Sequence, residues 1–234
     1  PWRVAGPASE GCLMAAPRIA LIHATPVSIG PIADSFRRLW PEAEATNLLE
    51  DALAPDRAKQ AELTPGIAAR IHALADYAML TGADAILFSC SAFGPAITAA
   101  GARLPIPVLK PNEAMFEEAL ALGDRVGMIC TFQPSIATMR AEFAEEAARL
   151  RPGASLSVTL VDHAMAALRA GDGATHHRLV SAAAAGFSGV DAIMLAQFSV
   201  ATALDDCRAR TAIPILSSPD AAVRKVRRLI EQKT

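Results

Sequence analysis

The residue with the clearest chemical potential in this chain is Cys90, which lies between Ser89 and Ser91. The apolar run before it, residues 85–88, is typical of a buried strand, and the alanine-rich segment after Gly94 is typical of a helix. Cys90 would therefore lie at the carboxyl end of a strand, where open α/β sheets bind ligands. Because a helix N-terminus lowers the pKa of a nearby thiol, we expect thiolate character and a role as acid, base or nucleophile.

The elements around Cys90 recur further along the chain at one constant spacing of 107 residues. A repeat that holds over so many element boundaries indicates two similar lobes, and strands that alternate with helices predict a parallel sheet in each. The fold class is therefore α/β, with two pseudo-symmetric Rossmann-like halves, and the crevice between them is the expected ligand site. The pairs that share the spacing include Arg18 and Arg125, Ser28 and Ser135, Phe36 and Phe143, Gly82 and Gly189, and Asp84 and Asp191.

Hydrophobic periodicity and turn residues predict the elements that position the site. They indicate a strand over 18–23, a helix over 29–40, a weaker strand over 43–49 and a long helix over 55–81 that is interrupted at 64–66. The expected domains are a first lobe at 18–110, completed by 217–234, and a second lobe at 111–216. Residues 1–17 are expected to be a flexible leader or tag before a native start near Met14.

The repeat pairs the site residues of the two lobes. Cys90 corresponds to Gln197, Ser91 to Phe198, and Ala92 to Ser199. The early turns carry matching hydroxyls, at Thr25 and Ser28 in one lobe and at Thr131 and Ser135 in the other. Hydroxyl and N–H groups at four helix N-termini suit a small carboxylate ligand.

Composition excludes several other classes of protein. The formal net charge of −2 offers no basic surplus for nucleic acid, and the apolar runs are too short to span a membrane. The four cysteines lie far apart, which argues against a zinc site or a disulfide framework and fits a cytoplasmic protein. No glycine-rich fingerprint for a nucleotide follows any strand, and we expect neither a metal nor a cofactor.

Three segments together resemble the Asp/Glu racemase superfamily, which includes aspartate, glutamate and hydantoin racemases, maleate isomerase and arylmalonate decarboxylase. They are Phe88-Ser89-Cys90-Ser91-Ala92, Cys130-Thr131-Phe132-Gln133-Pro134-Ser135 and Leu195-Ala196-Gln197-Phe198-Ser199-Val200. The resemblance implies a cofactor-independent enzyme, a small carboxylate substrate and a homo-oligomer. In the racemases of this family, one cysteine from each lobe flanks the substrate's α-carbon, one removing a proton and the other returning one to the opposite face.

Carried over by position, the resemblance makes Cys90 the first-lobe cysteine, with the anion-holding residues Ser91 and Ala92 beside it. Phe198 and Ser199 would supply the same groups in the second lobe. Thr131 lies where the family contacts a carboxylate. The chain departs from the pattern at Gln197, which stands in place of the second cysteine and cannot transfer a proton at neutral pH.

The expected function is therefore a racemase or isomerase acting at the α-carbon of a small carboxylate, amino acid or hydantoin, with Cys90 as acid/base. His23 or His163 could serve as the second acid/base, since histidine titrates near neutrality. One alternative is a decarboxylase or other lyase that passes through an enediolate, because a single cysteine suffices to protonate it; the family's decarboxylase has its single cysteine in the second lobe. Another alternative is a non-catalytic carboxylate-binding protein. We expect Cys130 to be a core residue and His72, His176 and His177 to face solvent.

Overall fold

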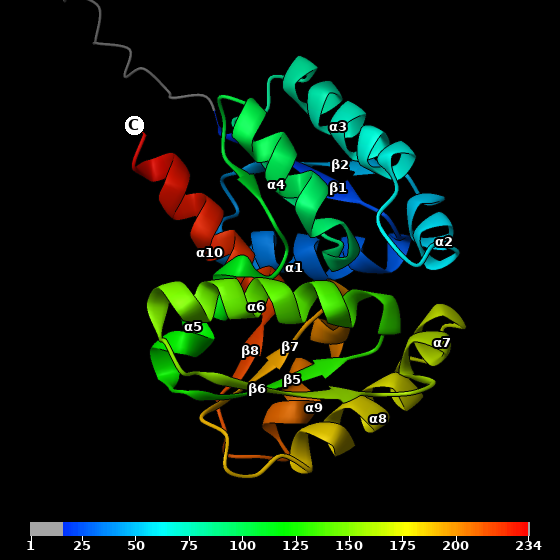
Figure 1. Cartoon of the computed structure of the whole chain (residues 1–234), viewed down its shortest axis with the longest axis vertical. Helices are drawn as coiled ribbons and strands as arrows, with labels where there is room; N and C mark the ends of the chain where they lie inside the picture. The colour runs from blue at the N-terminus through cyan, green and yellow to red at the C-terminus, as the bar shows by residue number, and fades with distance from the viewer. Residues whose placement is uncertain (1–15, 234) are drawn as a thin grey trace, which may run out of the picture.

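Two four-stranded parallel sheets organise the part of the chain that the computed structural model describes, residues 16–233. The strand order is β2-β1-β3-β4 in the first sheet and β6-β5-β7-β8 in the second, so the second lobe repeats the topology of the first (Figure 1). The predicted two-lobed α/β fold is confirmed. The strands are β1 Arg18–His23, β2 Glu44–Leu49, β3 Ala85–Phe88, β4 Val108–Leu109, β5 Arg125–Cys130, β6 Ser155–Leu160, β7 Ala192–Leu195 and β8 Ile215–Ser217.

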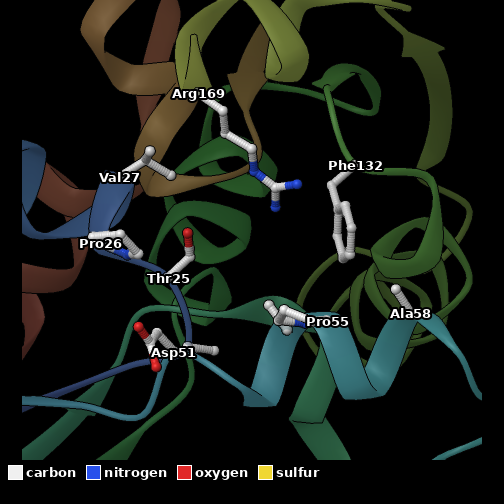
Figure 2. A pocket seen from close by; sticks show the side chains of 10 residues that line it. Thr25, Pro26, Val27, Asp51, Pro55, Ala58, Phe132 and Arg169 are labelled. Carbon is white, nitrogen blue, oxygen red and sulfur yellow. The ribbon is translucent and has the colours of Figure 1, made fainter. Parts of the chain in front are cut away.

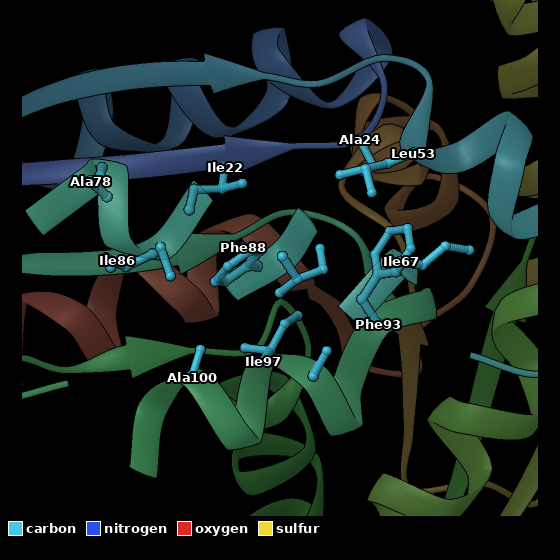
Figure 3. Close-up of a cluster of buried hydrophobic side chains, with 14 of the residues drawn as sticks. Ile22, Ala24, Leu53, Ile67, Ala78, Ile86, Phe88, Phe93, Ile97 and Ala100 are labelled. Carbon is cyan, nitrogen blue, oxygen red and sulfur yellow. The ribbon is translucent and has the colours of Figure 1, made fainter. Parts of the chain in front are cut away.

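Helices cover both faces of each sheet. Successive side chains of a strand point to opposite faces, so these apolar strands place apolar side chains on both faces, and both must be shielded from water. In the first sheet, Ile22 and Phe88 face α3 and α4 (Figure 3), while Leu21 and Leu87 on the other face pack against α1 and α10. The last helix of the chain therefore lies on the first lobe, beside α1 (Figure 1). The helices are α1 Ile29–Leu39, α2 Leu53–Ala58, α3 Pro65–Leu80, α4 Gly94–Arg103, α5 Glu113–Leu122, α6 Ile136–Leu150, α7 Ala164–Arg169, α8 Gly173–Ala185, α9 Leu204–Arg208 and α10 Ser218–Glu231.

The residues that reveal the repeat make equivalent contacts in both lobes. The backbone N–H of Arg18 donates to Asp84 Oδ2 at 2.8 Å, and that of Arg125 donates to Asp191 Oδ2 at 2.9 Å. Each aspartate thus joins the start of one strand to the start of its neighbour. Gly82 and Gly189 precede these aspartates with φ of 73° and 66°, a backbone conformation that glycine adopts without strain.

The structure divides the predicted long helix at 55–81 into two separate helices, α2 and α3. Pro65 cannot continue a helix from the residues before it but fits the first turn of a new one. Thr64 caps that new helix by accepting a hydrogen bond from the Ile67 N–H at 3.4 Å. Residues 59–64 therefore form a connection, which leaves the short helix α2 free to lie against the site.

Some expectations concern residues outside the described range. The predicted leader at 1–17, with its possible start at Met14 and with Cys12, falls almost entirely on residues 1–15, which the structure does not describe. Within residues 16–233, no helix is long and apolar enough to cross a membrane.

Candidate functional site

Cys90 follows β3 and precedes η2, a single 3₁₀ turn at Ser91–Phe93. The thiol is half-buried and lines a small cavity of about 40 Å³ between the two lobes. We call this the inner cavity. Its other walls come from both lobes, so the crevice predicted from the repeat exists at the predicted strand ends. The predicted site residues that line it with Cys90 are Thr25, Ser28, Ser91, Gln197, Phe198 and Ser199.

A larger outer cavity of about 410 Å³ adjoins the inner one and shares Thr25, Ala54, Phe132 and Arg169 with it. Arg169, the last residue of α7, extends its guanidinium into the outer cavity above Thr25, and Phe132 forms the opposite side (Figure 2). Asp51 lies at the rim on the first-lobe side (Figure 2). The cleft therefore combines the Cys90 thiol with the cationic side chain of Arg169, which lines both cavities.

The electrostatic state of Cys90 differs from the prediction. Burial raises the pKa of the Cys90 thiol to about 11, while the Ala92 backbone N–H and the positive charge of Arg57 lower it. Burial outweighs the effect of a helix N-terminus because α4 begins only at Gly94, after the 3₁₀ turn that follows Cys90. At neutral pH Cys90 is therefore a thiol, ready to donate a proton, rather than a thiolate.

His23 lies behind the site instead of facing it. It is fully buried at the end of β1, and its Nε2 lies 2.9 Å from Asn47 Oδ1. With Nε2–H donating to that oxygen, Nδ1 accepts from Ser89 Oγ at 2.8 Å, with Ser28 Oγ at 3.3 Å. Burial lowers the pKa of His23, and the hydrogen bond to Asn47 offsets part of the decrease. The neutral ring thus orients Ser89, the neighbour of Cys90.

Gln197 occupies the second-lobe wall of the inner cavity in a fixed orientation. Its Oε1 accepts from the Thr131 N–H at 3.0 Å and from Thr131 Oγ1 at 3.3 Å, and its Nε2 donates to Ser135 Oγ at 3.0 Å. Thr131 and Ser135, which the sequence predicted to bind substrate, hold Gln197 and do not line either cavity in the described chain. One Nε2 hydrogen of Gln197 remains for a ligand oxygen.

The other predicted acid/base, His163, is exposed at the start of α7 with a left-handed φ of 64°. It is not among the residues that line the two cavities of the described chain. Cys130 is a core residue, as predicted: it is fully buried, and burial raises its pKa to about 12. The prediction for His176 is wrong, because this ring is fully buried and its Nδ1 lies 3.0 Å from the Ala164 carbonyl oxygen.

The sequence did not reveal Arg169, Phe132 or Arg57 as site residues. Arg169 and Phe132 face the cleft only because the second lobe closes over the first. The available signals were weak: Phe132 lies within a segment that carries the family resemblance, and Arg169 follows His163 by one short helix. Among residues 16–233, no group of His, Cys, Asp and Glu side chains is placed to hold a metal ion.

Comparison with known proteins assigns the family. A family model described as Asp/Glu/Hydantoin racemase matches residues 30–184, more than half of the chain. The chain belongs to this family. Membership supports an enzyme of the racemase and isomerase type. A comparison with curated proteins found no match.

Solved structures share the fold of this racemase-family protein at low sequence identity. Glutamate racemase from Francisella tularensis subsp. tularensis SCHU S4, in complex with D-glutamate, matches with a TM-score of 0.71 and 12% identity over 94% of this chain and 83% of its own. Allantoin racemase from Klebsiella pneumoniae matches with a TM-score of 0.71 and 19% identity over 93% and 89%. A double mutant of arylmalonate decarboxylase in the liganded form matches with a TM-score of 0.64 and 20% identity over 94% of both chains. At these identities the likeness concerns the fold.

Proposed function

We propose that this protein is a cofactor-independent isomerase that acts at the α-carbon of a small carboxylate, an amino acid or a hydantoin, with Cys90 as its acid/base. The observation that carries the proposal is the position of the Cys90 thiol, which faces a cavity built by both lobes and opening toward a cationic side chain. Structures with this fold include racemases named for glutamate and allantoin, whose reacting centres are carbon atoms next to a carbonyl group.

The cleft has groups for holding the substrate's anion and the enolate. Among residues 16–233, no carboxylate forms an ion pair with Arg169, so its guanidinium is available to a substrate carboxylate. Ser91 and Ser199, from the two lobes, contribute their hydroxyls to the inner cavity. The spare Nε2–H of Gln197 can donate to the oxygen that becomes negative in the enolate.

Proton transfer follows from the state of Cys90. As a thiol, it can deliver its proton to the α-carbon of an enolate, which leaves a thiolate that the Ala92 N–H stabilises. In the reverse direction that thiolate removes the α-proton. Gln197 cannot take or give the proton on the opposite face, so we infer that water in the outer cavity does both: it accepts that proton when Cys90 gives its own, and it supplies one when the Cys90 thiolate acts as the base. Exchange of the Cys90 proton with solvent then restores the starting state.

A second candidate function, a decarboxylase, is favoured by the difference between Cys90 on one wall of the inner cavity and Gln197 on the other. Cys90 is the one cysteine among the described residues that line the inner cavity, and the facing side chain is an amide. Cleavage of the bond between the α-carbon and a carboxylate releases CO₂ and leaves its electron pair in an enediolate. One proton from Cys90 then completes the reaction. Arylmalonate decarboxylase shares the fold.

The test is incubation of the protein in D₂O with glutamate, aspartate, allantoin, substituted hydantoins and arylmalonates, followed by NMR and chiral chromatography. Incorporation of deuterium at the α-carbon with loss of optical purity supports the isomerase. Release of CO₂ with one deuterium in the product supports the decarboxylase and replaces the first proposal. Binding by calorimetry without either reaction would identify a carboxylate-binding protein and contradict both enzymatic proposals.

A further inference from the structure

Arg57 is a buried cation without an acidic partner. It lies in α2 with 7% of its surface exposed, and no carboxylate among residues 16–233 forms an ion pair with it. Its hydrogen bonds go to backbone oxygens: Nη1 donates to Gln60 O at 2.7 Å, and Nε donates to Ala92 O at 3.4 Å. Since burying a guanidinium without a counter-ion is costly, a function that needs this charge would explain its position.

The contact with Ala92 connects Arg57 to the reactive sulfur. The Ala92 carbonyl accepts from Arg57, and the Ala92 backbone N–H interacts with the sulfur of Cys90. The two elements are also fixed to each other by apolar packing, because Leu53 of α2 and Phe93 of η2 belong to one buried cluster (Figure 3). Arg57 therefore contacts the loop that carries Cys90, and it does not line either cavity.

We propose that Arg57 is a positioning residue for Cys90, holding the Ala92 peptide against the sulfur and keeping a fixed positive charge behind it when the sulfur is a thiolate. The part of this inference that concerns turnover rests on the proposed function; the part that concerns the sulfur does not. The remaining ionisable groups near the sulfur are Arg169 and Asp51 at the mouth of the cleft and His23 behind Ser89. Arg57 is the one whose charge lowers the pKa of Cys90.

The test measures alkylation of Cys90 by iodoacetamide from pH 7 to 11, with Cys90 resolved from the other cysteines by mass spectrometry. In Arg57→Gln we expect about tenfold slower alkylation at pH 9 and a pH profile displaced upward by about one unit, because the thiolate loses its charge partner. Arg57→Lys keeps the charge, and its rate should stay within about threefold of the wild type. Arg37→Gln, which removes an exposed arginine of the same lobe whose ion pair with Asp34 stays within α1, is the control and should leave the rate unchanged.

A purely structural role predicts the opposite direction, because a loosened loop would expose Cys90 and speed its alkylation. A rate for folded Arg57→Gln that equals or exceeds the wild-type rate overturns the proposal. If Arg57→Gln does not fold, Arg57→Met, which keeps the apolar stem, is measured in its place. If neither neutral variant folds, Arg57→Lys decides between the outcomes. A Cys90 alkylation rate within about threefold of the wild type supports the proposal, and a rate about tenfold lower contradicts it.

Turnover supplies an independent readout. Because Arg57 does not line the cleft, Arg57→Gln should lower kcat for α-proton exchange about tenfold and change KM by less than twofold. A protein that catalyses no exchange would refute the proposed function, while the alkylation profile would still decide the role of Arg57. A change confined to KM would show that Arg57 contacts the substrate and would overturn the positioning role.

Discussion

At the scale of single residues, the two walls of the inner cavity are chemically unequal. Cys90 on the first-lobe wall carries a transferable proton, whereas Gln197 on the second-lobe wall carries an amide held by Thr131 and Ser135. In a two-cysteine racemase both faces of the α-carbon would meet a sulfur. Under the proposed function, one face of the α-carbon would meet a thiol here and the other a hydrogen-bond donor, so exchange of the α-proton should be faster than inversion.

Gln197→Cys tests this asymmetry. A second sulfur on the opposite wall should deliver a proton to the other face, and we expect the ratio of inversion to α-proton exchange to rise at least about tenfold. The ratio is measured in D₂O by NMR and chiral chromatography. Gln197→Asn, which keeps an amide, is the matched control and should show no increase. An unchanged ratio in folded Gln197→Cys would mean that another group, or water alone, controls the second face.

Arg169 is the residue that should set substrate affinity. Its side chain lines both cavities and extends its guanidinium into the outer one (Figure 2). Because a guanidinium stays protonated, it can bind the anion without transferring a proton. Loss of a charge-assisted hydrogen bond costs about 1.5–3 kcal/mol, or about ten- to a hundredfold in binding. Arg169→Gln should therefore raise KM by that factor and change kcat much less. The exposed Arg178→Gln is the control, and equal KM values in the two variants would exclude Arg169 from the binding site.

At the scale of elements, helix α6 of the second lobe packs against the start of α4, just after the Cys90 loop. Glu142 of α6 is buried beside Gly94, where a Cβ atom would overlap its carboxyl group. Lys110 Nζ lies 3.6 Å from Glu142 Oε1, and Oε2 has no hydrogen-bond partner among the described residues. Burial raises the pKa of Glu142 to about 7, with Lys110 lowering it and the charges of Glu113 and Glu145 raising it.

This carboxyl group should make folding stability depend on pH. The folded protein binds the Glu142 proton more tightly than the unfolded chain, whose ordinary value is 4.5, so this contribution is fully present below pH 4.5 and is lost as the pH rises through about 7. The shift corresponds to a free energy on the order of 3 kcal/mol. In urea unfolding at pH 5 and pH 8, Glu142→Gln should lose less stability with rising pH than the wild type does. The exposed Glu62→Gln, which removes a carboxylate that does not act on Glu142, is the control, and identical pH dependence in wild type and Glu142→Gln would refute this assignment.

Elements that are determined by neighbouring residues could be predicted from the sequence, and the extent of the others could not. The strand ending before Cys90 and the interruption at 64–66 follow from neighbouring residues, and the structure has both. The extent of the helix predicted at 55–81 did not follow, because the periodicity continues across a segment in which Pro65 starts a new helix. The functional consequence is that Arg57 belongs to a separate short helix, which can approach the Cys90 loop.

At the scale of the whole molecule, the duplication places two equivalent strand ends on either side of one cleft. The spacing of 107 residues predicted this arrangement, because equivalent aspartates and glycines keep equivalent backbone contacts. The spacing could not predict what the lobes do to each other. The high pKa of Cys90, the opening of Arg169 into the cleft and the burial of Glu142 all depend on side chains brought together from distant parts of the chain.

The central claim is that the sulfur of Cys90 transfers the proton at the substrate's α-carbon. The most direct measurement is the rate of α-deuterium incorporation from D₂O for Cys90→Ala beside Cys207→Ala, in which a buried cysteine outside both cavities is removed. Loss of a positioned acid/base should slow Cys90→Ala by about 10²–10⁴-fold, while folded Cys207→Ala keeps its rate within about threefold of the wild type. A Cys90→Ala protein that exchanges the α-proton at the wild-type rate would contradict the account.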